Sequence, residues 1–176
     1  MTNKENYKQN YKNKITDKIV TDTEKYRQQY NLPVNTVGSG HNDSVDAFRH
    51  AYMSAYFARN WGQPVAKYIT DLHEKQGNKK GQDPKESNMD LWNNSIGRKI
   101  AHEVYKEYWN KGKTHHEIED ITAQKIVDKI NKGELITNPN DSRVYTEPTL
   151  FDNIKSKLKG ISTGQAAPEH ISTFYT

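Results

Sequence analysis

The sequence predicts an all-α protein, a helical bundle of about four to five helices with an irregular C-terminal segment. Apolar residues recur at intervals of three and four through most of the chain, which is the period of an amphipathic helix. Helix start and stop residues flank these stretches, with Asn, Asp or Thr before them and Gly after them. Only 32% of the residues are apolar, so we expect the core in one part of the chain, with polar ends.

Length and composition limit the kind of protein. A chain of 176 residues suits one domain with tails. The formal net charge of +4 permits contact with nucleic acid or anionic lipid without favouring either. The absence of cysteine excludes disulfides and thiolate metal sites, so a metal would need His, Asp, Glu or Asn ligands. No apolar run reaches the roughly 18 residues of a membrane span, and the start of the sequence shows no signal-peptide pattern.

The sequence suggests three parts. Residues 1–35 are rich in Lys, Asn, Gln and Tyr and predict an N-terminal polar helix or arm. Its mixture of lysine and tyrosine is compatible with nucleic-acid binding, although a solvated helix is the favoured interpretation. Residues 36–133 predict a helical core domain that carries the site. Residues 134–176 predict an irregular segment and tail, with a short helix at 150–158.

The central feature of the core domain is a helix that should begin at Asn42 or Asp43, two residues that favour the N-cap position. Asp46, Arg49 and His50 share one stripe of this helix, and the stripe continues into apolar residues. Because the apolar C-terminal part of this stripe should face the core, its polar N-terminal part should lie inside as well. Because buried ionisable groups are costly unless they are paired or bound, this stretch is a candidate site.

A second helix is predicted over residues 64–76, with Gly77 after its end. His73 lies at the C-terminal end of its apolar stripe, whereas Glu74 points well away from that stripe. Residues 77–86 should form a polar, exposed loop, and its length of about ten residues suggests a lid or binding loop. The apolar stripe that should face the core consists of Val65, Ile69 and Leu72.

A third helix should open at a capping box over residues 87–90. Asp90, Asn93 and Asn94 form the head of its inner stripe, which continues into small and apolar residues. The third helix therefore repeats the pattern of the central one. A fourth helix, opened by a second capping box, is expected over residues 115–132.

Short connections make neighbouring helices antiparallel, so the polar residues of the first three core helices should meet at one end of the bundle. Such a cluster suits a divalent metal ion with nitrogen and oxygen ligands. Without a metal, a His or Asp would act as general base, and Arg49 or the amides would stabilise negative charge. A satisfied buried network with no catalytic role is the alternative. The predicted metal ligands are His41, Asp46, His50 and Asp90.

Three motifs carry a resemblance to a known family: D-A-F-R-H-A-Y at residues 46–52, the His73-Glu74 step, and M-D-L-W-N-N-S-I-G-R at residues 89–98. Over roughly residues 41–102 the chain resembles a bacterial family of helical domains that often lie at the C-termini of Rhs-like, wall-associated and other polymorphic toxin or effector proteins. The resemblance implies that these polar positions are the family's signature. It favours an enzymatic toxin over a purely structural role, and it adds Glu74 to the candidate site.

We therefore expect an antibacterial toxin or effector enzyme, a hydrolase that acts on a phosphate-bearing or cell-envelope substrate, with or without a metal. The alternatives are a nuclease toxin and a non-catalytic binding or structural module. The protein would be delivered or secreted, cytoplasmic in the producing cell before export, and matched by a cognate immunity protein, with nucleic acid a less favoured partner. The expected catalytic residues are Asp46, Arg49, His50, His73 and Glu74, and the expected substrate-binding residues are Asn93, Asn94 and Arg98.

Overall fold

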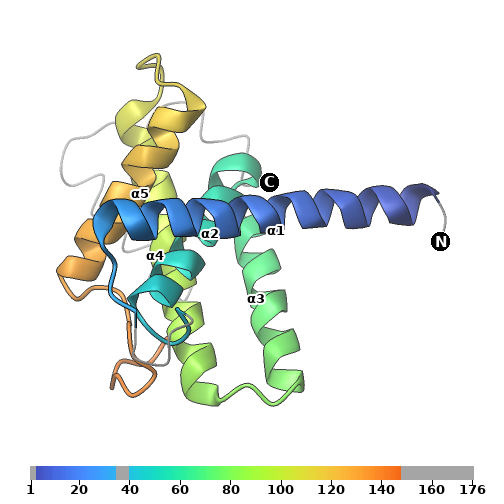
Figure 1. Ribbon diagram of the computed structural model, residues 1–176, viewed down its shortest axis with the longest axis vertical. Coiled ribbons are helices and arrows are strands. Elements are labelled where there is room, and N and C mark those ends of the chain that lie inside the picture. The colour runs from blue at the N-terminus through green and yellow to red at the C-terminus, as the bar shows by residue number, and fades with distance from the viewer. Residues whose placement is uncertain (1–2, 35–39, 148–176) are drawn as a thin grey trace. The chain divides into compact units, whose positions relative to one another are not determined.

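The computed structural model describes residues 3–34 and 40–147, and within these ranges the chain folds into five helices with no strand (Figure 1). This confirms the all-α prediction. The short helix expected at 150–158 lies outside the described residues. The chain divides into two units, Met1–Tyr145 and Thr146–Thr176, and all five helices belong to the first. They are α1 (Asn3–Tyr30), α2 (Ser44–Trp61), α3 (Gln63–Lys79), α4 (Pro84–Tyr108) and α5 (His115–Asn131).

The helix α2 is the central element, and it contacts each of the other four helices. It begins as predicted at Asp43, whose carboxylate accepts hydrogen bonds from the backbone N–H groups of Val45 and Asp46. It ends at Gly62, whose positive φ of 84° turns the chain directly into α3. That tight turn makes α2 and α3 antiparallel neighbours. None of the helices in the described ranges combines the length and the apolar character needed to cross a membrane.

The helices α2 and α4 pack unusually closely because small residues line their contact. Ala47, Ala51 and Ala55 of α2 are buried, and Gly97 of α4 lies opposite Ala51. A Cβ atom on Gly97 would lie only 2.0 Å from the carbonyl oxygen of Ala51. The backbones can approach because neither side chain occupies the space between them. This contact brings the polar N-terminal turns of α2 and α4 together.

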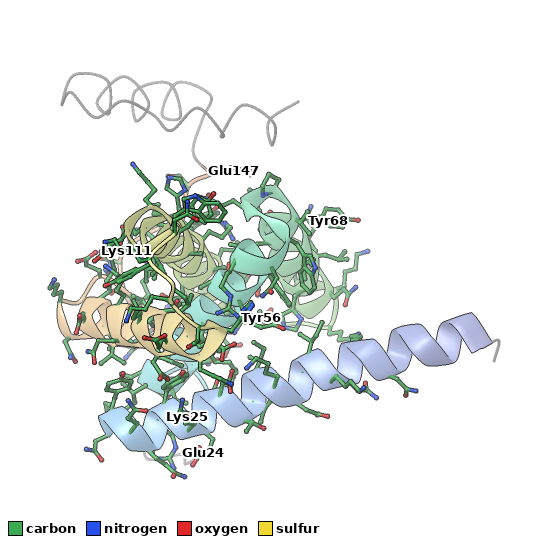
Figure 2. The ribbon with its side chains drawn as sticks, turned by 90° about the horizontal axis from the view of Figure 1, so that it is seen from above. Glu24, Lys25, Tyr56, Tyr68, Lys111 and Glu147 are labelled. Atoms are coloured by element: carbon green, nitrogen blue, oxygen red, sulfur yellow. The ribbon has the colours of Figure 1, made fainter. Side chains whose placement is uncertain are left out.

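The prediction for the inner face of α3 is wrong. Val65 and Leu72 are 43% and 42% exposed, and Tyr68 between them is 70% exposed and points outward in Figure 2. The buried face of α3 instead carries Thr70 and Glu74, together with Ala66. The physical reason is the polar face of α4, which requires hydrogen-bonding partners from α3 rather than apolar side chains. Val65 and Leu72 of the predicted stripe therefore face outward, and Ile69 is half-buried.

The predicted lid between α3 and α4 is also wrong. The helix α3 continues to Lys79, and α4 already begins at Pro84 with Asp83 as its N-cap, so the connection is short. Ser87 is not a capping residue. It lies inside α4, where its hydroxyl accepts a hydrogen bond from the Asn78 amide. Proline at the first helical turn and an aspartate before it are stronger start signals than the later Ser-x-x-Asp pattern.

The helices α1 and α5 complete the core on the other side of α2. The C-terminal half of α1 contributes Ile19 and Tyr26, and the Tyr26 hydroxyl donates to Asp120 of α5. The N-terminal half of α1 extends past the other helices (Figures 1 and 2). The helix α5 begins with the predicted capping box, in which the Thr114 and Glu117 side chains bind each other's backbone N–H groups. Residues 134–147 contain neither helix nor strand, as predicted.

Candidate functional site

The polar heads of α2, α3 and α4 meet at one end of the bundle, as the antiparallel arrangement predicts. His50 lies at the centre of this group. Its Nε2 atom is 3.5 Å from an Asp46 oxygen and 3.3 Å from an Asp90 oxygen, and its Nδ1 atom is 3.7 Å from a Glu74 oxygen. All four side chains are buried. We call Asp46, His50, Glu74 and Asp90 the acid cluster.

Asp46 is held in place by the segment before α2 and by its own helix. The backbone N–H of Asn42 donates to its Oδ2 atom at 2.6 Å, and the His41 ring lies 3.4 Å from the same oxygen. Arg49 forms an ion pair with its Oδ1 atom. The side chain of Asp46 is therefore fixed in orientation, with Arg49 reaching it from one turn further along α2.

The other side of the acid cluster is less completely satisfied. Gln82 donates to one oxygen of Asp90 at 2.8 Å, and Asn94 donates to one oxygen of Glu74 at 3.4 Å. Nine buried side-chain atoms of the described residues make no hydrogen bond of good geometry, and four of the nine lie here: His50 Nδ1, Glu74 Oε2, Asp90 Oδ1 and Asn94 Oδ1. Buried polar atoms are normally hydrogen-bonded, so this concentration in one place points to a missing ligand.

Burial and like charge control protonation in the acid cluster. Burial lowers the pKa of His50 to about 4, so its imidazole is neutral near pH 7 and has a free lone pair. Burial, followed by the neighbouring Glu74 and Asp46 carboxylates, raises the pKa of Asp90 to about 8. Burial also raises the pKa of Glu74 to about 7. Without a bound cation, Asp90 and Glu74 therefore keep their protons to a higher pH than ordinary carboxyl groups do.

Three members of the acid cluster could hold a metal ion. One ligand atom from each of Asp46, His50 and Asp90 lies within 4.8 Å of the other two. Metal–ligand bonds of about 2.0–2.2 Å at tetrahedral angles place neighbouring ligand atoms about 3.3–3.5 Å apart. The distances from His50 Nε2 to Asp46 and Asp90 are 3.5 and 3.3 Å, so this spacing fits a first-row divalent cation.

Glu74 completes this arrangement at the second ring nitrogen of His50. Its Oε1 atom is 3.7 Å from His50 Nδ1, and its side chain also contacts Asp90. A carboxylate in that position typically fixes the tautomer of a metal-binding histidine. The predicted direction of Glu74 was wrong because the stripe assumed to be inner faces solvent. A signal was present in the sequence, since Ala66, Thr70 and Glu74 recur every four residues.

The two remaining histidines of the prediction lie at the edge of the acid cluster. The ring of His73 is 6.4 Å from that of His50, and its side chain is exposed. His41 lies between Asp46 and Glu86, with 59% of its side chain exposed. Both therefore stand beside the candidate metal centre. Gln82 and Asn42, which contact Asp90 and Asp46, could not be selected from the sequence, because loop amides and backbone donors carry no recognisable spacing.

Asn93 and Arg98 occupy buried positions with partners of their own. The Asn93 amide donates to the Ile136 carbonyl at 2.8 Å and accepts from the Ile136 N–H at 3.0 Å, tying residues 134–136 to α4. Arg98 donates to Thr70 at 3.2 Å and lies 3.5 Å from Ser54. Substrate binding by these two residues stays a prediction, whereas Asn94 lies directly against the acid cluster.

Residues 7–134 match the family described as Domain of unknown function (DUF6973). Because this match spans more than half of the chain, the chain belongs to that family. The matched range includes α1 from residue 7 onward, all of α2 to α5, and every member of the acid cluster. No solved structure matches the chain.

Proposed function

We propose that this DUF6973 domain is an antibacterial toxin or effector enzyme, a metal-dependent hydrolase of a phosphate-bearing or cell-envelope substrate. One observation carries the proposal. Three carboxyl groups from three helices surround a neutral, buried imidazole and leave polar atoms without hydrogen bonds. Such an arrangement is costly to maintain in a folded protein unless a ligand binds there.

A purely structural network accounts for this arrangement less well. A buried network is stabilising when each donor meets an acceptor, and a half-satisfied one is worse than an apolar core. Here Arg49 faces Asp46, while Glu74 and Asp90 lie beside each other. Among the described residues, no Lys or Arg lies within ion-pair distance of either, and the neighbouring His50 ring is neutral. A divalent cation would neutralise these carboxylates and occupy the free lone pairs.

We assign the cation to Asp46, His50 and Asp90, which is the ligand set with matching distances. A divalent cation in such a site would lower the pKa of a bound water toward neutrality. Glu74 is then the general base. Its raised pKa near 7 suits proton transfer at neutral pH, and Asn94 orients its carboxylate. Arg49 lies at the edge, where it would contact negative charge on the substrate.

The assignment to toxins rests on the resemblance to domains of polymorphic toxin and effector proteins. A toxin of that kind needs a cognate immunity protein that protects the producing cell. Delivery or secretion follows from the same resemblance. The substrate class follows from Arg49 and from the N-terminal ends of α2 and α4 at the acid cluster, because helix N-termini favour anions.

Induced expression in bacteria tests the proposal. The full chain would be produced in the cytoplasm and, separately, behind a periplasmic signal. We expect wild type to arrest growth in one compartment, and His50→Ala to be harmless while still folded. His102→Ala is the matched control, because His102 is an exposed histidine of α4 outside the acid cluster. Harmless wild type in both compartments, or arrest that persists in His50→Ala, would refute the enzymatic toxin.

A further inference from the structure

Two aromatic side chains are exposed together at the end of α4 that lies opposite the acid cluster. Tyr105 is 46% exposed and Trp109 is 61% exposed, and the centroids of their rings are 4.7 Å apart. The helix α4 ends at Tyr108, but the N–H of Trp109 still donates to the Tyr105 carbonyl at 2.9 Å, which keeps both rings on one side of the helix. The two rings form a contiguous apolar patch, and such a patch marks a site of interaction.

These rings lie at a projecting part of the domain. In Figure 1 the connection from α4 to α5 extends past the adjoining ends of α2 and α3, and Lys111, which is labelled in Figure 2, belongs to this connection. Asn110 and Gly112 have positive φ values of 60° and 65° and reverse the chain there. Small-molecule sites are concave, whereas a convex end can contact a broad, flat surface.

The charges around the rings are unbalanced toward positive. Glu107 forms an ion pair with Lys125 at 2.9 Å, and Lys113 is paired with the first turn of α5. Lys106 and Lys111 are exposed, and no carboxylate of the described residues lies within ion-pair distance of either. We call Tyr105, Lys106, Trp109 and Lys111 the aromatic tip. Its uncompensated charge favours an anionic partner.

A phospholipid bilayer is the anionic partner that fits both features. Tryptophan and tyrosine are enriched at the level of the lipid head groups, because their rings are apolar while the N–H or O–H group stays hydrated. Lysines beside them are attracted to the negative charge of lipids such as phosphatidylglycerol. A second copy of this chain fits less well, since contact through the same rings would bring the lysines of both tips together. No described helix is long and apolar enough to cross a bilayer, so the contact would be peripheral.

We propose that the aromatic tip attaches the domain to the surface of an anionic phospholipid bilayer, with Tyr105 and Trp109 among the head groups and the two lysines at the phosphates. This inference goes beyond the proposed hydrolase, because such binding requires neither a metal ion nor the acid cluster. The length of α4 places Trp109 about 30 Å from Asp90. The lipid beneath the tip is therefore a docking surface, out of reach of the candidate metal centre.

Co-sedimentation with vesicles tests this inference. The full chain, kept in EDTA, is mixed with vesicles of phosphatidylcholine that contain or lack phosphatidylglycerol. We expect wild type to bind the vesicles with phosphatidylglycerol more tightly. Tyr105→Gln/Trp109→Gln should weaken that binding at least about tenfold, because the apolar surface that enters the bilayer is lost. Lys106→Gln/Lys111→Gln should weaken it about tenfold, and only when phosphatidylglycerol is present.

Matched control variants come from α3. Tyr68→Gln/Leu72→Gln removes two exposed apolar side chains, and Lys75→Gln/Lys79→Gln removes two exposed lysines. Each control should change vesicle binding less than about twofold, since its residues lie outside the aromatic tip and distant charges are screened by salt. Circular dichroism confirms that each double variant is folded. If the aromatic variant is unfolded, the lysine variant and its control decide.

Three results would overturn the inference: no binding of wild type to either kind of vesicle, an equal loss in tip and control variants, or a wild-type dimer in analytical ultracentrifugation that Tyr105→Gln/Trp109→Gln converts to a monomer. The last result would identify a second copy of the chain as the partner. His50→Ala should bind vesicles as wild type does. Failure of vesicle binding together with growth arrest by wild type would therefore refute the aromatic tip alone.

Discussion

Gly97 of α4 lies against Ala51 of α2 so closely that a Cβ atom on Gly97 would be 2.0 Å from the Ala51 carbonyl oxygen and 2.9 Å from its Cα atom. Ala51 directly follows His50, and Gly97 lies one helical turn after Asn94. The contact therefore sets the separation of the two helices at the acid cluster. His50 reaches Asp90 only because these backbones come this near.

Gly97→Ala should destabilise the protein and weaken the candidate metal centre together. The new methyl group meets backbone, which cannot rotate away, so α4 must move from α2. Overpacking typically costs about 1–3 kcal/mol, and we expect at least the upper part of that range here. Urea unfolding measures the stability, and calorimetric titration with Mn²⁺ or Zn²⁺ measures the metal affinity.

Gly77→Ala is the matched control for the stability measurement alone, because Gln82, which the new Cβ atom would meet, also contacts Asp90. The Cβ atom added at Gly77 would meet the end of the Gln82 side chain, which is flexible and can move. Alanine is also the better helix former, so the free energy of unfolding should stay within about 1 kcal/mol of wild type. Equal destabilisation by both substitutions would mean that the α2–α4 spacing is not the cause.

Divalent metal should stabilise the folded protein. Saturation at about 100 times the dissociation constant adds about 2.7 kcal/mol, which corresponds to a rise in Tm of about 5–10 °C for a chain of this size. Differential scanning fluorimetry after EDTA treatment and addition of Mn²⁺ or Zn²⁺ measures this rise. The rise should vanish in His50→Ala and Asp90→Asn, and it should persist in His102→Ala. No rise in wild type would refute the metal centre.

Without metal, stability should fall as the pH rises from about 6.5 to 8. The pKa of Asp90 is raised to about 8 and that of Glu74 to about 7, so the folded state holds protons that the unfolded chain has already released. Stability from a raised carboxyl pKa is present at low pH and is lost as the pH rises through the folded value. The loss should approach about 1.4 kcal/mol per pH unit for each proton.

The pH window separates these carboxyl groups from His50. The lowered pKa of His50 acts in the opposite direction, but only between about 4 and the ordinary histidine value near 6.5. Urea unfolding in EDTA at several pH values provides the measurement. In Asp90→Asn the slope above pH 6.5 should become shallower. A slope identical to wild type in this variant would show that Asp90 is not the group that holds the proton.

Asn93 and Asn94 should behave differently although they are adjacent, buried and chemically identical. Asn93→Ala removes two hydrogen bonds to the Ile136 backbone and leaves that backbone unsatisfied, so we expect a loss of about 2–4 kcal/mol without a change in metal affinity. Asn94→Ala removes a single long hydrogen bond to Glu74. It should cost less stability and reduce growth arrest instead. The reverse order of stabilities would contradict the assigned roles.

Most of the helices follow from local sequence. Asp43 and Thr114 were predicted as helix caps and are caps, because an N-cap depends on a few adjacent residues. The polar head of α4 was recognised because Asp90, Asn93 and Asn94 interrupt an otherwise apolar or small stripe. The start of α4 was misplaced where two local signals competed, and Asp83 with Pro84 prevailed.

The sequence by itself determined that His50, Asp46 and Asp90 are buried polar residues on helices whose ends meet, because helical period and short connections are local properties. Only the tertiary structure decided that Glu74 faces inward while Leu72 faces solvent. Either face of α3 satisfies its own helical period. The choice between them depends on the polar surface that α4 presents to α3. Which face of an amphipathic helix is buried is decided by its neighbour, because buried polar groups must find polar partners.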